Sequence, residues 1–309
     1  MCLLLRQNGL PPCTGHRPAG GLLMESPAQA TLASSIPFTP ERVMNVSILQ
    51  LATQHGDRAA NFANAEAQIR LAMEAQPNAP DVLVLPEVWD VGYPRNVAEL
   101  GDPNGQAARS FLSAQAAQWK VNIVGGSIVR SQGGKNWNTA YVFDRQGQQL
   151  AAYDKIHLFS FGGEQNVFQP GDAPARYSLD NVPAGSVTCY DIRFCELVRA
   201  QALAGVHLLF VPAMWGKARV EHWRLLIRAR AVENQMFVIG VNMAETPGSG
   251  ISGGHSLIVD PLGTVLAEAW PEQTILQADC SLDMLRETRA GFTVFRDRCP
   301  ELYARLNQA

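Results

Sequence analysis

Residues 187–197, VTCYDIRFCEL, decide the fold: a cysteine follows a short apolar run and precedes a charged cluster. Residues 187–188 predict the end of a buried strand, and residues 196–204 predict a helix that Gly205 can end. Cys189 therefore lies at a strand-to-helix turn, where free backbone N–H groups favour a thiolate and stabilise an oxyanion. We take Cys189 as the candidate nucleophile; the alternative is a small buried hydrophobic residue.

The composition is that of a soluble globular protein. The chain has 309 residues, of which 47% are hydrophobic and 17% charged, enough for one large α/β domain or two small ones. A formal net charge of -3 gives no electrostatic reason to expect nucleic acid or a membrane surface as partner. No apolar run reaches the length of a transmembrane helix.

The cysteines and histidines predict neither a disulfide framework nor a metal site. The six cysteines have no framework spacing, which favours a reducing compartment, and hence the cytoplasm. No CxxC or HxxxH pattern occurs, so we expect no zinc. A redox pair of Cys189 and Cys195 is a further alternative.

The chain changes character near Met44. Residues 1–43 mix Gly, Pro, Ser and Ala without a sustained period and predict an irregular extension. The apolar patch at residues 2–5 is too short for the core of a signal peptide. The folded domain is expected to span residues 44–309.

From Met44 onward, one pattern of elements occurs twice. Each half reads strand, helix, strand, helix and then three strands, beginning at residues 46–51 in the first half and with the strand that reaches Cys189 in the second. This predicts an α/β fold with two similar halves, their sheets packed face to face and their helices outside. Residues 274–278 are another strand candidate, and the apolar tail after them is expected to dock on the core or a neighbouring subunit.

Three chemically active side chains fall where predicted strands end. Glu87 follows the apolar run at 82–85, Lys155 lies in DKIHLF at 154–159, and Cys189 completes the set. In parallel α/β sheets, ligands bind beyond the carboxyl ends of the strands. An isolated lysine of this kind is ordinarily a surface residue with a partly buried stem; beside a carboxylate and a thiol, we favour a functional role.

Here the sequence resembles a known family. LVLPE at 83–87, DKIHLF at 154–159 and CYDIRF at 189–194 are similar to the three catalytic blocks of the nitrilase (carbon-nitrogen hydrolase) superfamily, in the expected order. Further matches are VPAMW at 211–215, HW at 222–223, ARAVENQ at 229–235, GVN at 240–242 and GGHSLIVDPLG at 253–263. The resemblance implies a four-layer α-β-β-α sandwich.

The resemblance also implies a mechanism without metal or cofactor. Glu87 acts as general base and then acid, and Cys189 forms an acyl thioester. Lys155 and the backbone N–H of Tyr190 stabilise the oxyanion. Glu164, in FGGEQNVFQPGD at 161–172, matches a second glutamate that holds Lys155 or positions the water; the alternative is a solvated loop carboxylate.

The residues that follow the nucleophile favour an amide as the substrate. Tyr-Asp after the nucleophile resembles amidases, and CYDxRF with a short 155–164 segment is similar to omega-amidases, which release ammonia from 2-oxo acid amides such as 2-oxoglutaramate. Such a substrate needs a cation for its carboxylate. Arg219 is the candidate, unless it is an ordinary helix-entry charge. Tyr93, Tyr190 and Trp215 are expected to bind substrate with it.

Other functions remain open at this point. The chain could be an amidase for deaminated glutathione or a carbamoyl amine, or a catalytically silent interaction protein with the same fold. The resemblance implies a homodimer. Asp191 and Arg193 are expected to support the nucleophile turn. Cys195 replaces the family's usual proline, which suggests oxidative sensitivity.

Overall fold

The structure is a computed structural model that describes residues 42–75, 79–245 and 252–306. The expected extension over residues 1–43 lies outside this part of the chain, except for its last two residues. Val43, the last residue of that range, is the first residue of the first strand.

The doubled pattern of elements is confirmed. The first half contains β1 (Val43–Gln50), α1 (Arg58–Glu74), β2 (Val82–Val84), α2 (Gln106–Trp119), β4 (Asn122–Gln132), β5 (Lys135–Phe143) and β6 (Gln149–Asp154). The second contains β8 (Val182–Ser186), α3 (Cys195–Leu203), β9 (Leu208–Ala213), α4 (Val220–Asn234), β10 (Phe237–Asn242), β11 (Leu257–Val259) and β12 (Val265–Glu268). The strand before Cys189 ends at Ser186 rather than at residue 188.

Short elements lie between these. They are the 3-10 helices η1 (Val97–Leu100), η2 (Ser160–Gly162), η3 (Glu164–Asn166), η4 (Cys189–Arg193) and η5 (Lys217–Arg219), and the strand β3 (Asp102–Pro103). Two strands, β7 (Ala175–Leu179) and β13 (Thr274–Ser281), each follow one complete half, and the helices α5 (Leu282–Gly291) and α6 (Pro300–Leu306) follow β13.

The two sheets have the same internal order. One runs β13-β1-β2-β4-β5-β6, with β3 beside β4, and the other runs β7-β8-β9-β10-β11-β12. In each, the first three strands of the half are parallel and the next two antiparallel. The strand that follows each half joins the other half's sheet: β7 pairs with β8, and β13 pairs with β1.

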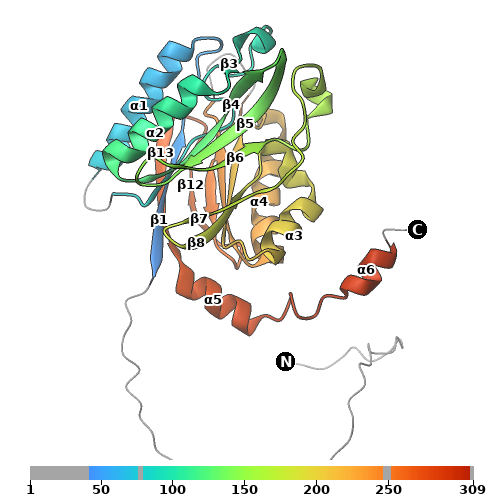
Figure 1. Ribbon diagram of the computed structural model, residues 1–309. Coiled ribbons are helices and arrows are strands. Elements are labelled where there is room, and N and C mark those ends of the chain that lie inside the picture. The colour runs from blue at the N-terminus through green and yellow to red at the C-terminus, as the bar shows by residue number, and fades with distance from the viewer. Residues whose placement is uncertain (1–41, 76–78, 246–251, 307–309) are drawn as a thin grey trace, which may run out of the picture. The chain divides into compact units, whose positions relative to one another are not determined.

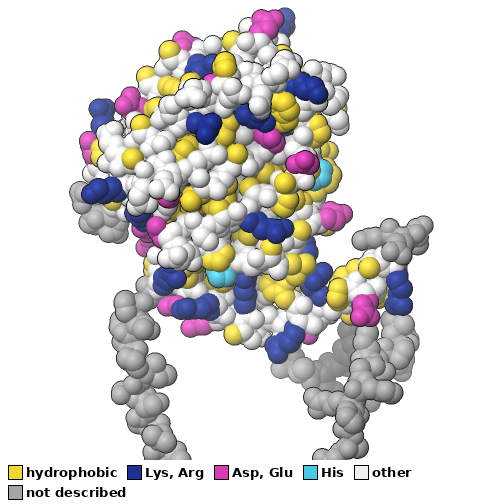
Figure 2. All heavy atoms as spheres, in the orientation of Figure 1, with side chains coloured by type: hydrophobic (Ala, Val, Ile, Leu, Met, Phe, Trp, Pro, Cys, Tyr) yellow, Lys and Arg dark blue, Asp and Glu magenta, His cyan; other side chains and the backbone are white. Residues whose placement is uncertain are grey.

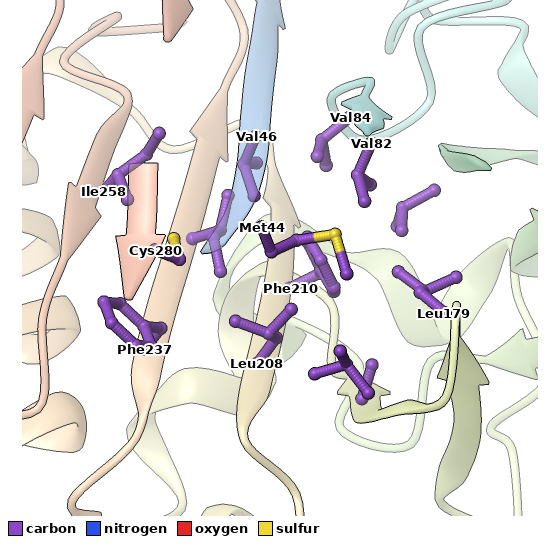
Figure 3. Packing of buried hydrophobic residues seen from close by; sticks show 14 of the residues in the cluster. Met44, Val46, Val82, Val84, Leu179, Leu208, Phe210, Phe237, Ile258 and Cys280 are labelled. Atoms are coloured by element: carbon purple, nitrogen blue, oxygen red, sulfur yellow. The ribbon is translucent and has the colours of Figure 1, made fainter. Parts of the chain in front are cut away.

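The sheets pack face to face through an apolar core (Figure 3). Met44, Val46 and Val84 of one sheet contribute to the same buried cluster as Phe210 and Phe237 of the other. Burial of such side chains contributes about 1.5–3 kcal/mol each relative to exposure. The interface between the two sheets is therefore a main source of the stability of the fold.

Helices cover both outer faces (Figure 1). α1 and α2 pack on the first sheet, and Ala65, Ile69 and Ala72 of α1 lie on one helical face as their spacing predicts. α3 and α4 cover the second sheet, with Trp223 and Ile227 fully buried. The four-layer α-β-β-α sandwich of two similar halves is therefore confirmed.

The predicted docking of the tail holds in part. Phe295 packs against the core, with the guanidinium groups of Arg199 and Arg289 over its ring. By contrast, Phe292 is 62% exposed, and α6 exposes Leu302 and Tyr303. None of the helices in the described part of the chain combines the length and hydropathy needed to cross a bilayer.

Candidate active site

Glu87 joins the two halves of the sandwich. It follows β2, and its N–H donates to the carbonyl of Ala213, the last residue of β9, at 3.4 Å. In return, the N–H of Met214 donates to Glu87 Oε2 at 2.8 Å. The carboxyl ends of β2 and β9 thus meet at this carboxylate, which is 1% exposed.

A glycine allows the close backbone approach before Glu87. Gly126 has a φ of +61°, and a Cβ there would lie 2.0 Å from the carbonyl oxygen of Pro86. The bulge that contains Gly126 also lets the N–H of Ser127 donate to that oxygen at 3.1 Å. Only glycine can occupy this position without displacing the segment that carries Glu87.

Lys155 lies between two carboxylates. Its Nζ is 2.9 Å from Glu87 Oε1 and 2.9 Å from Glu164 Oε1, and its side chain is completely buried. Glu164 is itself buried, and its Oε2 accepts the N–H of Phe159 at 2.9 Å. Glu164 is therefore a structured partner of Lys155, and the alternative of a solvated loop carboxylate is wrong.

Two further polar side chains complete this buried cluster. The hydroxyl of Tyr93 is 3.2 Å from Glu87 Oε1 and 3.1 Å from Glu164 Oε1. Asn138, on β5, donates to Glu87 Oε1 at 2.8 Å and to the Tyr93 oxygen at 3.0 Å.

Cys189 begins η4 in a backbone conformation unusual for a side-chain-bearing residue, with a φ of 49°. Such left-handed residues are costly and persist where the surroundings fix them. Val187 before the turn and Ile192 within it are fully buried in the core beneath α3 and α4. The backbone of Cys189 is thus fixed at the first residue of η4, and its buried neighbours hold the thiol in place.

Asp191 links this turn to the Lys155 segment. Its Oδ2 accepts the N–H of Thr188 at 2.9 Å and the hydroxyl of Tyr153 at 2.6 Å. Its Oδ1 accepts the N–H of His157 at 2.8 Å and lies 2.9 Å from the Nδ1 of the same residue. These contacts agree with the expectation that Asp191 supports the turn at Cys189.

The charges of the site set its resting protonation. Burial raises the pKa of Glu87, but the charge of Lys155 and hydrogen bonds from Lys155, Cys189 and Met214 outweigh burial and bring it below the ordinary value. Burial lowers the pKa of Lys155, whereas the charges of Glu87 and Glu164 raise it well above its ordinary value. Glu87 is therefore ionised and Lys155 protonated at neutral pH.

The thiol rests in its neutral form. Burial, and then the negative charge of Glu87, raise the pKa of Cys189 well above its ordinary value. Burial and the charge of Glu87 therefore outweigh any preference for the thiolate that the backbone N–H groups of the turn provide. The nearby ionised Glu87 is the group able to remove the thiol proton during reaction.

A pocket of about 280 Å³ opens beside the thiol. It is lined by Phe159, Cys189, Tyr190, Arg193, Met214, Trp215, Gly216 and Arg219. Three of the four residues predicted to bind substrate, Tyr190, Trp215 and Arg219, thus lie around one cavity. Tyr93 does not line it; its hydroxyl lies between the two glutamates instead.

Both arginines of the pocket lie on aromatic rings. The Arg219 guanidinium is 5.4 Å from the ring centroid of Phe159, and that of Arg193 is 4.7 Å from the Trp215 ring. Neither arginine forms a salt bridge within the described residues. From the sequence, Arg193 was predicted only to support the turn at Cys189, because the sequence does not show that its side chain lines the pocket.

Asn138 is the polar residue that sequence reasoning missed. It lies in the middle of the strand that runs from Lys135 to Phe143, inside a stretch that reads only as a strand. Residues 138–143 of this strand are buried, and a polar side chain at the start of such a run is the signal that could have identified it.

Comparison with known proteins identifies the family of this chain. The sequence model of the family "Carbon-nitrogen hydrolase" matches residues 45–290. The 2-oxoglutaramate amidase of Bacillus subtilis is 38% identical over 259 residues, which cover 84% of this chain and 98% of the relative. The human protein omega-amidase NIT2 is 34% identical over 75% of this chain and 87% of its own.

A solved structure has a similar fold. It is a mutant amidase from Nesterenkonia sp. AN1 with the acetamide moiety of fluoroacetamide added covalently at its active site cysteine. The likeness has a TM-score of 0.72 and 27% identity, over 85% of this chain and 97% of that chain. The chain therefore belongs to the carbon-nitrogen hydrolase family of the nitrilase superfamily, and it is a hydrolase of carbon-nitrogen bonds other than peptide bonds.

Proposed function

We propose that this enzyme is an omega-amidase that cleaves the terminal amide of a small 2-oxo acid such as 2-oxoglutaramate. The observation that carries the proposal is the pocket at Cys189, which is lined by two arginines that form no salt bridge within the described residues. A guanidinium binds a carboxylate through paired N–H donors. The names of the relatives from Bacillus subtilis and human support the same substrate class.

The first half of the reaction breaks the amide bond. Glu87 takes the thiol proton as the sulfur of Cys189 attacks the amide carbon, giving a tetrahedral oxyanion. Lys155 and the N–H of Tyr190 stabilise that oxyanion. Protonated Glu87 then gives its proton to the departing nitrogen, so ammonia leaves and an acyl thioester remains.

The second half regenerates the thiol. Glu87 removes a proton from a water molecule, which attacks the thioester carbon, and the proton returns to the sulfur as the carboxylic acid leaves. Glu164 holds Lys155 throughout, because both carboxylates lie 2.9 Å from the same ammonium. Each step uses only the protein's own side chains and water.

Arg219 is expected to discriminate between charged and neutral amides. Changing Arg219 to Met should raise the KM for 2-oxoglutaramate about 10- to 100-fold, the value of a hydrogen bond to a charged group. The KM for a neutral amide such as butyramide should change much less. An ammonia-release assay on a panel of amides, with 2-oxosuccinamate included, measures both.

The matched variant is Arg193→Met, which removes the second guanidinium of the same pocket. If the carboxylate is held by Arg219 alone, this variant keeps the preference for charged amides. Equal effects of Arg219→Met on charged and neutral amides would refute the assignment. Turnover of deaminated glutathione or a carbamoyl amine in preference to 2-oxo acid amides would refute the substrate class.

We also propose a cytoplasmic homodimer whose hydrolase domain spans residues 44–309. Apolar side chains gather on α6 (Figure 2), where Leu302, Tyr303 and Leu306 are exposed, and a second copy could cover them. Sedimentation equilibrium tests the dimer.

The cysteines support the cytoplasmic location. Cys189, Cys195 and Cys280 are thiols without a disulfide, which suits a reducing compartment.

A further inference from the structure

Asn138 contacts three residues of the buried cluster, through both its side chain and its backbone. Its side chain is fully buried, and its two amide hydrogens reach Glu87 Oε1 at 2.8 Å and the Tyr93 oxygen at 3.0 Å. Its backbone carbonyl accepts the N–H of Lys155 at 2.9 Å. Asn138 thus contacts the proposed base, the tyrosine beside it and the backbone that carries the lysine.

The two oxygens of Glu87 differ in how many donors they face. Oε1 receives Lys155 Nζ at 2.9 Å and Asn138 Nδ2 at 2.8 Å, with the Tyr93 hydroxyl at 3.2 Å. Oε2 receives the N–H of Met214 at 2.8 Å. A carboxylate oxygen offers about two lone-pair positions, so Oε1 is fully occupied and the open position belongs to Oε2.

The orientation of the Asn138 amide follows from the carboxylate. Its Oδ1 is buried and has no hydrogen-bond partner in the part of the chain that the structure describes. Turning the amide over would place this oxygen against Glu87, so that two acceptors would face each other. An unsatisfied buried oxygen costs about 1–3 kcal/mol. The hydrogen bond from the Asn138 amide to the ionised Glu87 offsets this cost.

We propose that Asn138 is a positioning residue for the base: it holds Oε1 of Glu87 and thereby presents Oε2 to the thiol of Cys189. The inference rests on the proposed function, in which Glu87 removes the thiol proton. Because the amide N–H bonds the ionised carboxylate, loss of this donor raises the pKa of Glu87. The other titratable groups that face Glu87, namely Lys155, Glu164, Tyr93 and Cys189, are unchanged by a substitution at Asn138.

The test is the variant Asn138→Leu, which keeps the size of the side chain and removes the donor. Two pH profiles are measured: kcat/KM for ammonia release, and the rate of Cys189 alkylation by iodoacetamide followed by mass spectrometry. We expect kcat/KM at neutral pH to fall about 10- to 100-fold. The acid limb of both profiles should move up by about one pH unit or more. A residue that only stabilises the fold would lower activity without moving the limb.

The matched control is Thr139→Val on the same strand. Thr139 is equally buried, and its hydroxyl donates to Asp154 Oδ1 at 2.5 Å, next to Lys155, without contacting Glu87. Its acid limb should coincide with that of the wild type. If Asn138→Leu does not fold, Asn138→Asp keeps the shape and replaces the donor with an acceptor, and its limb should move in the same direction.

A folded Asn138 variant whose acid limb matches the wild type would overturn the proposal, as would an equal shift in Thr139→Val. The alkylation profile needs no substrate. If 2-oxo acid amides are not hydrolysed, the proposed function fails, while the alkylation profile still decides whether Asn138 positions the base.

Discussion

Changing Cys189 to Ala is expected to reduce ammonia release to background, a fall of at least about 10⁴-fold in kcat. The loss follows because no other thiol lines the pocket beside Glu87 in the described residues. The fold should persist, since the side chain loses one sulfur atom at the edge of the core. Steady-state kinetics with 2-oxoglutaramate, together with thermal unfolding, measure both effects.

Cys195→Ala is the matched control, because this thiol is close in sequence but exposed, with Glu196 as its hydrogen-bond partner. It should retain turnover and, like the wild type, it should form an acyl adduct on Cys189 that mass spectrometry can detect. Full activity of Cys189→Ala would remove the proposed nucleophile. Loss of activity in Cys195→Ala instead would point to the redox pair of the two thiols.

Changing Lys155 to Met should affect both activity and stability. Without the ammonium, Glu87 and Glu164 are two buried carboxylates that face one site, so we expect a loss of about 3–5 kcal/mol in the free energy of unfolding at neutral pH. The oxyanion loses its cation as well, and kcat should fall at least about 100-fold. Urea unfolding and amide turnover measure the two effects.

The pH dependence of this variant gives a sharper test. In the wild type, the lowered pKa of Glu87 means that its stabilising contribution is lost as the pH falls below the ordinary value of 4.5. In Lys155→Met, the pKa of Glu87 should rise, because the ammonium charge no longer opposes the effect of burial, so the variant should become more stable as the pH falls from 8 to about 5.5. A deficit that is independent of pH would contradict the buried charge cluster.

Lys217→Met provides the comparison. The side chain of Lys217 is 60% exposed, and its ammonium lies 2.9 Å from Glu245. Exposed pairs of this kind contribute about 0–1 kcal/mol. The same chemical change should therefore cost little there, and a large loss would show that the effect at Lys155 is not specific to burial.

Local patterns in the sequence were sufficient to predict the repeated elements. The apolar run at residues 82–85 predicts β2, because such a run depends on neighbouring residues alone. The pairing of β13 with β1 could not be predicted in the same way. It joins strands from opposite ends of the folded region, and no local period specifies a partner.

The site shows the same division. Glu87, Lys155 and Cys189 were recognisable as candidates because each lies shortly after a predicted strand, inside a distinctive motif. Asn138 and Arg193 were not, because their importance arises from distances across the structure: 2.8 Å to Glu87 for one, and a ring 4.7 Å away in the pocket wall for the other. The resting state of Cys189 also depends on burial and on the charge of Glu87, neither of which is visible in residues 187–197.

The pairing of β1 with β13 has a consequence for synthesis on the ribosome. β1 leaves the exit tunnel among the first folded elements, but its antiparallel partner is among the last, so one edge of the first sheet stays open while most of the chain is being made. An open edge invites pairing with other nascent chains. Premature termination before residue 274 would therefore release a product with an unsealed sheet, prone to aggregate even though Glu87, Lys155 and Cys189 had all been translated.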